Sequence, residues 1–290
     1  MTTRLILCAD DYGLSEGQSQ AILDLAQRRR ISATSAVVTA PDWRSAARAL
    51  VPLRPTLAVG LHLNLTEGAP LGAMPRFARG GVFPSILRAV SGSLMRTLPV
   101  DELRDEIARQ VREFQNALGA PPDFIDGHQH VHALPQVGDF LLAVLEDIDP
   151  QRRVLLRDPA DLFSRIVARR LAITKAGVLT LLTRTFGPKA RALGYRTNDG
   201  FSGVSHFVDT PQAVTRDFQS ATTYLGPRHI MMCHPGFHES AQNALEARRA
   251  LEFSALMSHE ALSQLVWQPQ RDAGGAIVWP RALPDVNDDR

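Results

Sequence analysis

Residues 4–13 have the sequence RLILCADDYG, an apolar run that meets two aspartates and then a Tyr-Gly pair. The run at 4–9 predicts a short β-strand. Directly after it, the apolar spacing in residues 16–29 predicts an amphipathic helix with Ala21, Ile22 and Leu25 on one face. A strand followed at once by a helix is the unit from which parallel α/β sheets are built.

The same alternation continues almost to the end of the chain. Further strands are predicted at 33–40, 57–65, 124–131, 154–157 and 229–233, and helices at 43–50, 100–118, 136–147, 162–193, 241–257 and 260–266. Residues 68–99 are rich in Gly and Pro and are expected to form a long irregular loop. This order predicts a single α/β domain, residues 1–290, with a barrel-like parallel sheet and a lid or insertion at about 162–200.

The composition excludes several classes of protein. Of 290 residues, 44% are hydrophobic and 21% charged, which is typical of a globular protein, and 32 basic against 30 acidic residues leave a net charge of +2. No basic run with interleaved aromatic residues is present, so no nucleic-acid partner is expected. The most apolar long stretch, residues 171–186, contains Lys175 and Arg184, which favours a partly buried or lid-like helix and no transmembrane segment.

The N-terminus and the cysteines bear on the compartment. The first apolar run is too short for the core of a signal peptide. Two cysteines far apart in the sequence, Cys8 and Cys233, do not make a disulfide framework. We therefore expect a cytoplasmic protein.

The pair Asp10 and Asp11 ends the first predicted strand. Two adjacent carboxylates repel each other, and a cation beside them relieves that repulsion. Because neighbouring side chains at a strand end point in different directions, one can be a metal ligand and the other a base. The alternative is a turn or helix-capping pair before the helix that starts near Ser15.

Histidine and asparagine alternate with leucine in the strand predicted at 57–65. Period-two spacing places His62 and Asn64 on one face, which fits a strand whose tip lines a pocket. The alternative for His62 is a core or rim residue without a catalytic role.

Residues 124–132, FIDGHQHVH, hold the densest set of titratable groups. As a continuous strand this segment would place Asp126, His128, His130 and His132 on one face. Same-face residues lie about 6.5–7 Å apart along a strand, so only one or two of the histidines can reach a single ion. The others are expected to bind substrate or to orient the ligands; an exposed edge strand is the alternative.

Two further polar residues end predicted strands. His234, in Cys233-His234-Pro235-Gly236, stands where the chain must turn and is a candidate general acid. Arg157 ends the strand at 154–157 and is expected either to hold a catalytic carboxylate or to pair with a surface acid. One Asp and two His at such strand ends would make a hydrolytic metal site with open positions for water and substrate.

These residues resemble the YdjC-like carbohydrate deacetylases, which include the chitooligosaccharide deacetylases. Four strings carry the resemblance across nearly the whole chain: ADDYG at 9–13, GLHLNLTEG at 60–68, DGHQHVH at 126–132 and CHPG at 233–236. The family usually has Phe at the position of Tyr12. The resemblance implies a distorted (β/α) barrel of the TIM type and a divalent metal, usually Mg²⁺ and sometimes Zn²⁺.

The resemblance also implies roles for individual residues. Asp11, His62 and His128 are similar to metal ligands, and Asp10 to the general base. His234 corresponds to a candidate acid, and Arg157 to the arginine that tunes the base. Asn64, Asp126, His130 and His132 are left to support the ligands or contact substrate.

The implied reaction is hydrolysis of the acetamide of an N-acetylated amino sugar, on a chitooligosaccharide or a related glycan or glycolipid. Hydrolysis of a phosphoester or cyclic amide and a non-catalytic metal- or sugar-binding barrel are the alternatives. Asp and His suit magnesium, manganese and zinc alike, so the sequence leaves the metal open. It also leaves open whether His128 or His130 is the inner ligand, and whether the protein is a homodimer.

Overall fold

The strand predicted at the N-terminus lies in the interior of the sheet, between two other strands, in the computed structural model, which describes residues 5–237 and 244–280. Strand β1 (Leu5–Tyr12) pairs in parallel with β2 (Ala33–Ala36) on one side and with β8 (His229–Cys233) on the other. All eight residues of β1 are buried, as expected of a parallel strand covered on both faces.

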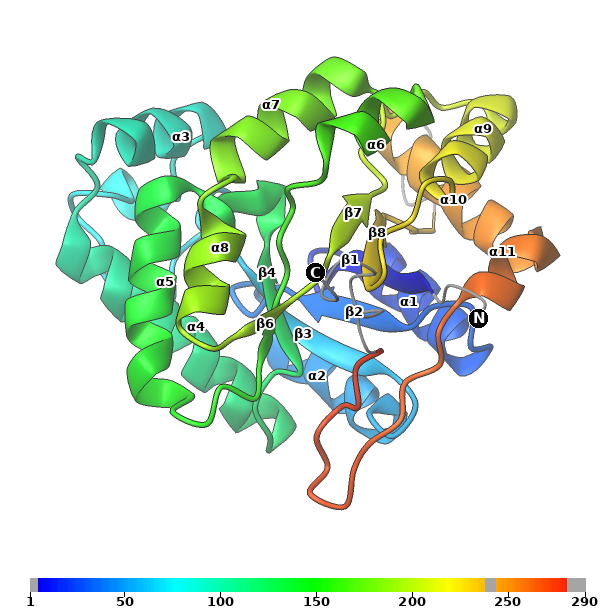
Figure 1. Ribbon diagram of the computed structural model, residues 1–290. Helices are drawn as coiled ribbons and strands as arrows, with labels where there is room; N and C mark the ends of the chain where they lie inside the picture. The colour runs from blue at the N-terminus through cyan, green and yellow to red at the C-terminus, as the bar shows by residue number, and fades with distance from the viewer. Residues whose placement is uncertain (1–4, 238–243, 281–290) are drawn as a thin grey trace, which may run out of the picture.

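The remaining strands are also parallel and extend the sheet on both sides of β1 (Figure 1). They are β3 (Ala58–Leu63), β4 (Phe124–Gly127), β5 (Leu155–Leu156), β6 (Arg196–Thr197) and β7 (Gly200–Ser202), in the order β6-β5-β4-β3-β2-β1-β8-β7. The sheet curls with helices outside it, which confirms the predicted distorted (β/α) barrel.

The two edges of the sheet are joined by one short segment, residues 196–202. Its first part, β6, pairs with β5, and its second part, β7, pairs with β8. Between them, the Asn198 side chain donates hydrogen bonds to the carbonyls of Asp158 and Gly200 and accepts one from the Asp158 amide. A single stretch of chain therefore serves both edges.

Most of the helices cover the outside of the sheet. In chain order the helices are α1 (Glu16–Gln27), α2 (Trp43–Leu50), α3 (Ile86–Met95), α4 (Val100–Leu118), α5 (Pro135–Ile148), α6 (Phe163–Arg169), α7 (Ile173–Thr183), α8 (Phe186–Ala192), α9 (Pro211–Ala221), α10 (Ala244–Ser258) and α11 (Glu260–Leu265). Helices α3 and α7 contribute to a pocket at the carboxyl ends of the strands. Within the described residues, no helix is both long and apolar enough to cross a membrane.

The core has two parts that follow the alternation of side chains along the strands. On β1, Leu5, Leu7 and Ala9 pack in the larger cluster, which includes buried residues of the covering helices. Ile6 and Cys8 point to the other face and pack in a smaller cluster inside the barrel. The next residue on this inner face is Asp10.

Some predicted elements differ from the structure. The loop predicted at 68–99 contains helix α3, whose alanine and leucine content the Gly and Pro around it obscured. Strand β7 and helix α9 were not predicted. Of the helix predicted at 241–257, residues 241–243 lie outside the described residues, and α10 is described from Ala244.

Candidate active site

Alternation brings five predicted site residues to one rim of the barrel interior. On five strands, apolar side chains on the inner face are followed two or four residues later by a polar side chain at the carboxyl end. The apolar residues are Ile6 and Cys8, Ala58, Phe124, Leu155, and Ile230 and Met232. The polar side chains are Asp10, His62, Asp126, Arg157 and His234. This rim is where α/β barrels place their active sites.

Asp11 reaches the same rim by leaving the strand geometry. Its φ is +71°, in the left-handed region, and the pairing of β1 with β2 shifts register between Ala9 and Tyr12. Asp tolerates this region better than most residues do, because its short side chain can hydrogen-bond locally. The turn separates the two carboxylates of the pair, so that Asp10 and Asp11 have different partners.

Asp11, His62 and His128 form a compact group of candidate metal ligands. Asp11 Oδ1 lies 3.3 Å from His62 Nε2 and 3.0 Å from His128 Nδ1. One ligand atom from each residue lies within 4.8 Å of the other two. Bonds of about 2.1 Å to one ion put its ligand atoms roughly 3.0–3.4 Å apart, so the carboxylate–imidazole distances and the donor types both fit a divalent metal.

The His62 ring is held in place by contacts at its Nδ1 atom. Its Nδ1 lies 2.6 Å from Asp126 Oδ1 and 3.0 Å from the Ser35 hydroxyl, which leaves Nε2 directed at Asp11. Such a carboxylate–histidine pair is the common support of a metal-binding imidazole. Burial favours neutral imidazole, but the carboxylates of Asp126 and Asp11 outweigh it and raise the pKa of His62 to about 10.

His128 lies between two carboxylates. Nδ1 contacts Asp11, and Nε2 lies 3.0 Å from Glu67 Oε2. Burial would lower the pKa of His128, but the hydrogen bonds to Asp11 and Glu67 raise it above its ordinary value. Glu67 belongs to the GLHLNLTEG string, yet no role was predicted for it.

The continuous strand predicted through residues 124–131 is wrong. Strand β4 ends at Gly127, and residues 128–133 form a short 3₁₀ segment in which Gln129 (φ 52°) and His130 (φ 61°) are left-handed. The chain must turn here because α5 begins only a few residues later, at Pro135. The predicted common face of Asp126, His128, His130 and His132 is therefore absent.

His130 and His132 consequently lie in different environments. His130 lines the pocket and packs edge-on against Phe201, and burial lowers its pKa well below the ordinary value. His132 is fully buried, with Nε2 2.7 Å from the Arg157 carbonyl oxygen, and burial lowers its pKa to about 3. His132 thus holds the backbone of Arg157 as a neutral donor.

Arg157 is completely buried and fixes the second carboxylate of the Asp pair. Its guanidinium donates to both oxygens of Asp10 at 2.8 and 2.7 Å and pairs with Asp126 at 3.0 Å. Burial would raise the pKa of Asp10, but Arg157 holds it well below its usual range. Cys8, Asp10 and Asp126 also lie close enough to share an ion, but the guanidinium already supplies their positive charge.

Asn64 does not line the pocket; it shapes the loop that carries Glu67. Its amide oxygen accepts hydrogen bonds from the backbone of Thr66 and Glu67, and its nitrogen donates to the carbonyl of Glu67. Asn64, which was predicted to lie near the site, therefore acts on it only through Glu67, which contacts His128.

Two functional neighbours, Arg249 and Ser35, carried no sequence signal. Arg249, on α10, donates to Asp11 Oδ2 at 2.9 Å. Ser35, on β2, contacts His62 and lies 3.4 Å from Asp10. A lone arginine in a helix or a lone serine in a strand is common in any protein, so only the folded chain identifies them.

A pocket of about 440 Å³ opens over these residues. His234 lines it, with its backbone amide held by Glu252 at 2.7 Å and its ring tilted against Phe207 at 5.3 Å between centroids. The volume suits a small organic ligand. A second cavity, between α6, α7 and β7, is only about 20 Å³ and has room for little more than one water molecule.

Comparison with known proteins agrees with the motifs. Residues 4–266 match the family of YdjC-like proteins. The chain is 33% identical to the chitooligosaccharide deacetylase of Proteus mirabilis over 82% of this chain and 83% of that protein. It is 28% identical to the chitooligosaccharide deacetylase of Salmonella paratyphi C over 88% and 90%.

A solved structure shows a similar fold. An Enterococcus faecalis protein named for cellobiose-phosphate cleavage superposes with a TM-score of 0.63 at 21% identity, covering 91% of this chain and 94% of that one. The extent of the family match and the identity to the Proteus relative lead to one conclusion. The chain belongs to the YdjC-like protein family.

Proposed function

We propose that this protein is a metal-dependent carbohydrate deacetylase that hydrolyses the acetamide of an N-acetylated amino sugar. One observation carries the proposal: the candidate ligands Asp11, His62 and His128 converge beside a second carboxylate, Asp10, that is held separately by Arg157. The names of the Proteus and Salmonella relatives support the sugar substrate and the acetyl group.

Asp11, His62 and His128 would hold the ion. Magnesium is the first candidate and zinc the second, since a carboxylate and two imidazoles can ligate either. When bound, a divalent ion polarises the acetyl carbonyl and makes water more acidic. Asp126 at His62 Nδ1 would keep this ring in the tautomer that leaves Nε2 available as a ligand.

Asp10 is the proposed general base. The bidentate pair with Arg157 keeps this carboxylate ionised and fixed in direction, so it can accept the proton of the attacking water at any pH near neutrality. Its basicity is modest, and the reaction therefore depends on water that is already acidified. Arg157 is a positioning residue, because it acts through Asp10.

His234 is the proposed general acid. It lines the same pocket directly after the end of β8, which pairs with the strand that carries Asp10. A proton on its ring would pass to the sugar nitrogen as the C–N bond breaks, so that the leaving group departs as a neutral amine.

The test is acetate release from N-acetylglucosamine oligomers with and without EDTA. The proposal predicts release that EDTA abolishes and added Mg²⁺ or Zn²⁺ restores. Hydrolysis of phosphoesters or cyclic amides without acetate release would favour the first alternative, and metal-dependent sugar binding without turnover the second. The cytoplasmic location and the homodimer stay predictions.

A further inference from the structure

The pocket over the proposed metal site has unusually apolar walls. Most of its titratable side chains gather around Asp11 and its neighbours, whereas α3 contributes Ile86 and Val90, and α7 contributes Val178, Leu179 and Leu182 beside a single charged residue, Lys175. A carbohydrate presents hydroxyl groups in every direction and needs polar partners along such walls. Apart from Lys175, these two helices offer only apolar side chains to the pocket.

Helix α7 is apolar and yet barely buried. Within Ile173–Thr183 the only charged residue is Lys175, whose ammonium is already bonded to the Ser205 carbonyl and lies over the Phe207 ring. Only Thr183 of this helix is buried, and Val178 and Leu181 are 53% and 60% exposed. A helix that is apolar all round is normally covered on every side. Here Ala176 and Leu179 pack against the smaller core cluster, whereas Val178 and Leu181 stay exposed.

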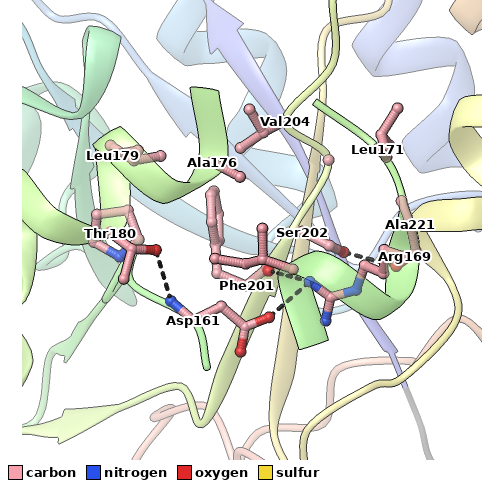
Figure 2. A pocket seen from close by; sticks show the side chains of 13 residues that line it. Asp161, Arg169, Leu171, Ala176, Leu179, Thr180, Phe201, Ser202, Val204 and Ala221 are labelled. Carbon is pink, nitrogen blue, oxygen red and sulfur yellow. Dashed lines mark hydrogen bonds and ion pairs between the residues drawn. The ribbon is translucent and has the colours of Figure 1, made fainter. Parts of the chain in front are cut away.

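The position of α7 is fixed by polar anchors. Figure 2 shows Thr180 accepting a hydrogen bond from the Asp161 amide, while Arg169 of α6 binds the Asp161 carboxylate and the Phe201 carbonyl of β7. These contacts attach α6 and α7 to the barrel wall. The helix is therefore fixed with Val178, Leu179 and Leu182 at the pocket.

Helix α3 lines the same pocket with Ile86 and Val90. Leu87, on the same helix, is 78% exposed beside this wall but does not line the pocket itself. Figure 1 shows α3 and α7 along the same edge of the molecule. Five apolar side chains from these two helices line one pocket, which indicates an apolar ligand.

Aromatic platforms for a sugar chain are missing from the pocket. The three tryptophans, Trp43, Trp267 and Trp279, are buried, and none of the three tyrosines lines the pocket among the described residues. Tyr and Trp rings combine a flat apolar face with a polar edge, which suits the apolar face of a pyranose. Among the described lining residues the one benzene ring is that of Phe207, which has no polar edge and has Lys175 over its face.

We propose that the substrate is an amphiphile, an N-acetylated amino sugar on a hydrocarbon aglycone, whose hydrocarbon lies between α3 and α7. This inference rests on the proposed deacetylase function and specifies its substrate class. The acetamide sits at Asp11 and Asp10, and the chain leaves along Val90, Val178 and Leu182. The hydrocarbon covers the apolar side chains that the fold leaves exposed.

The test compares methyl and octyl N-acetyl-β-glucosaminides below the concentration at which the octyl compound forms micelles. We expect kcat/KM for acetate release to be at least about tenfold higher for the octyl glycoside, since burying even two methylenes corresponds to about that factor. Val178→Asp should bring the octyl-to-methyl ratio close to one. Val51→Asp, at a residue of similar exposure (47%) that does not line the pocket, should preserve the ratio.

A measurement on the unaltered protein does not depend on the folding of a variant. Octyl glucoside, which has no acetamide, should inhibit hydrolysis of the methyl substrate competitively, and methyl glucoside should not. Equal kcat/KM for the two glycosides, or a higher value for soluble chitotriose than for the octyl glycoside, overturns the amphiphile inference and leaves the deacetylase proposal intact. No acetate from any of these substrates overturns both.

Discussion

Arg157 donates two parallel hydrogen bonds to Asp10, and both side chains are buried, with exposures of 0% and 2%. The same guanidinium pairs with Asp126, which in turn holds His62. One arginine thus links the proposed base to the proposed metal ligand. Lysine cannot reproduce this arrangement, because it is a point charge without a planar fork.

Arg157→Lys is therefore expected to raise the pKa of Asp10 and to disorder its carboxylate. The acid limb of the kcat/KM profile should move to higher pH, and kcat should fall by roughly 10-fold to 100-fold. The measurement is acetate release from pH 4 to pH 9. Arg44→Lys, which breaks an exposed bidentate pair with Glu113, is the control and should leave the profile in place. If the acid limb of Arg157→Lys stays at the pH of the unaltered protein, Asp10 is not the general base.

Asp10→Asn and Asp11→Asn distinguish base from ligand. Asp10→Asn should keep the bound metal and lose about 10²–10⁴-fold in kcat, because the amide cannot accept a proton. Asp11→Asn, His62→Ala and His128→Ala should lose the metal itself. Metal content by elemental analysis, together with acetate release, checks both. Normal turnover of Asp10→Asn would refute its assigned role.

Metal binding is expected to release protons. In the metal-free protein the carboxylates of Asp126 and Asp11 raise the pKa of His62 to about 10, so this ring holds a proton at pH 7. The hydrogen bonds to Asp11 and Glu67 also raise the pKa of His128. An ion needs neutral imidazole, so its affinity should rise with pH between 6.5 and 9. Titration calorimetry in buffers of different ionisation enthalpy measures the protons released. Glu67→Gln removes one carboxylate that raises the pKa of His128, so this variant should release fewer protons when the metal binds.

The same shift makes the stability of the metal-free protein depend on pH. The folded pKa of His62 is about 10 and the unfolded value is about 6.5. The stabilisation is complete below the unfolded value and is lost as pH rises toward the folded one, by roughly 1 kcal/mol per pH unit. The measurement is the free energy of unfolding by urea in the presence of EDTA at pH 7.0 and 8.0. At these pH values ionisation of Cys8 and Cys233 in the unfolded chain adds little to the pH dependence. Constant stability would show that His62 is neutral.

Two glycine substitutions of the same kind should have opposite effects. An added Cβ at Gly60 would lie 2.5 Å from the Phe124 ring inside the barrel, so Gly60→Ala should destabilise the protein by about 1–3 kcal/mol. Gly177, within α7, has only an ordinary contact with Phe163 at 3.7 Å. Gly177→Ala should raise stability by about 0.5–1 kcal/mol, as expected inside a helix. Thermal melts of both variants give the comparison.

The parts of the site that could be predicted from sequence are those that follow strand alternation. The apolar strands and their polar ends were sufficient to predict the barrel and to select Asp10, His62, Asp126, Arg157 and His234 as residues of one rim. The turn after Gly127 could not be predicted, because Gln129 and His130 adopt left-handed backbone that neither residue type requires.

Other features depend on contacts across the fold. Arg249 meets Asp11 from a residue 238 positions away in the chain, and nothing local marks it. The roles assigned to the ligands and to the base stay predictions until metal content and turnover are measured. What the fold adds is proximity, since it places these groups within hydrogen-bond distance of one another.

Residues 196–202, which serve both edges of the sheet, have a consequence for solubility. An open sheet ends in rows of unpaired amides and carbonyls on which another chain can add a strand. Here one edge strand has two residues and the other three, and the chain passes directly from one to the other through Asn198 and Asp199. Neither edge offers a template long enough for a second copy to extend, so the barrel is protected from edge-to-edge aggregation by the same segment that joins its edges.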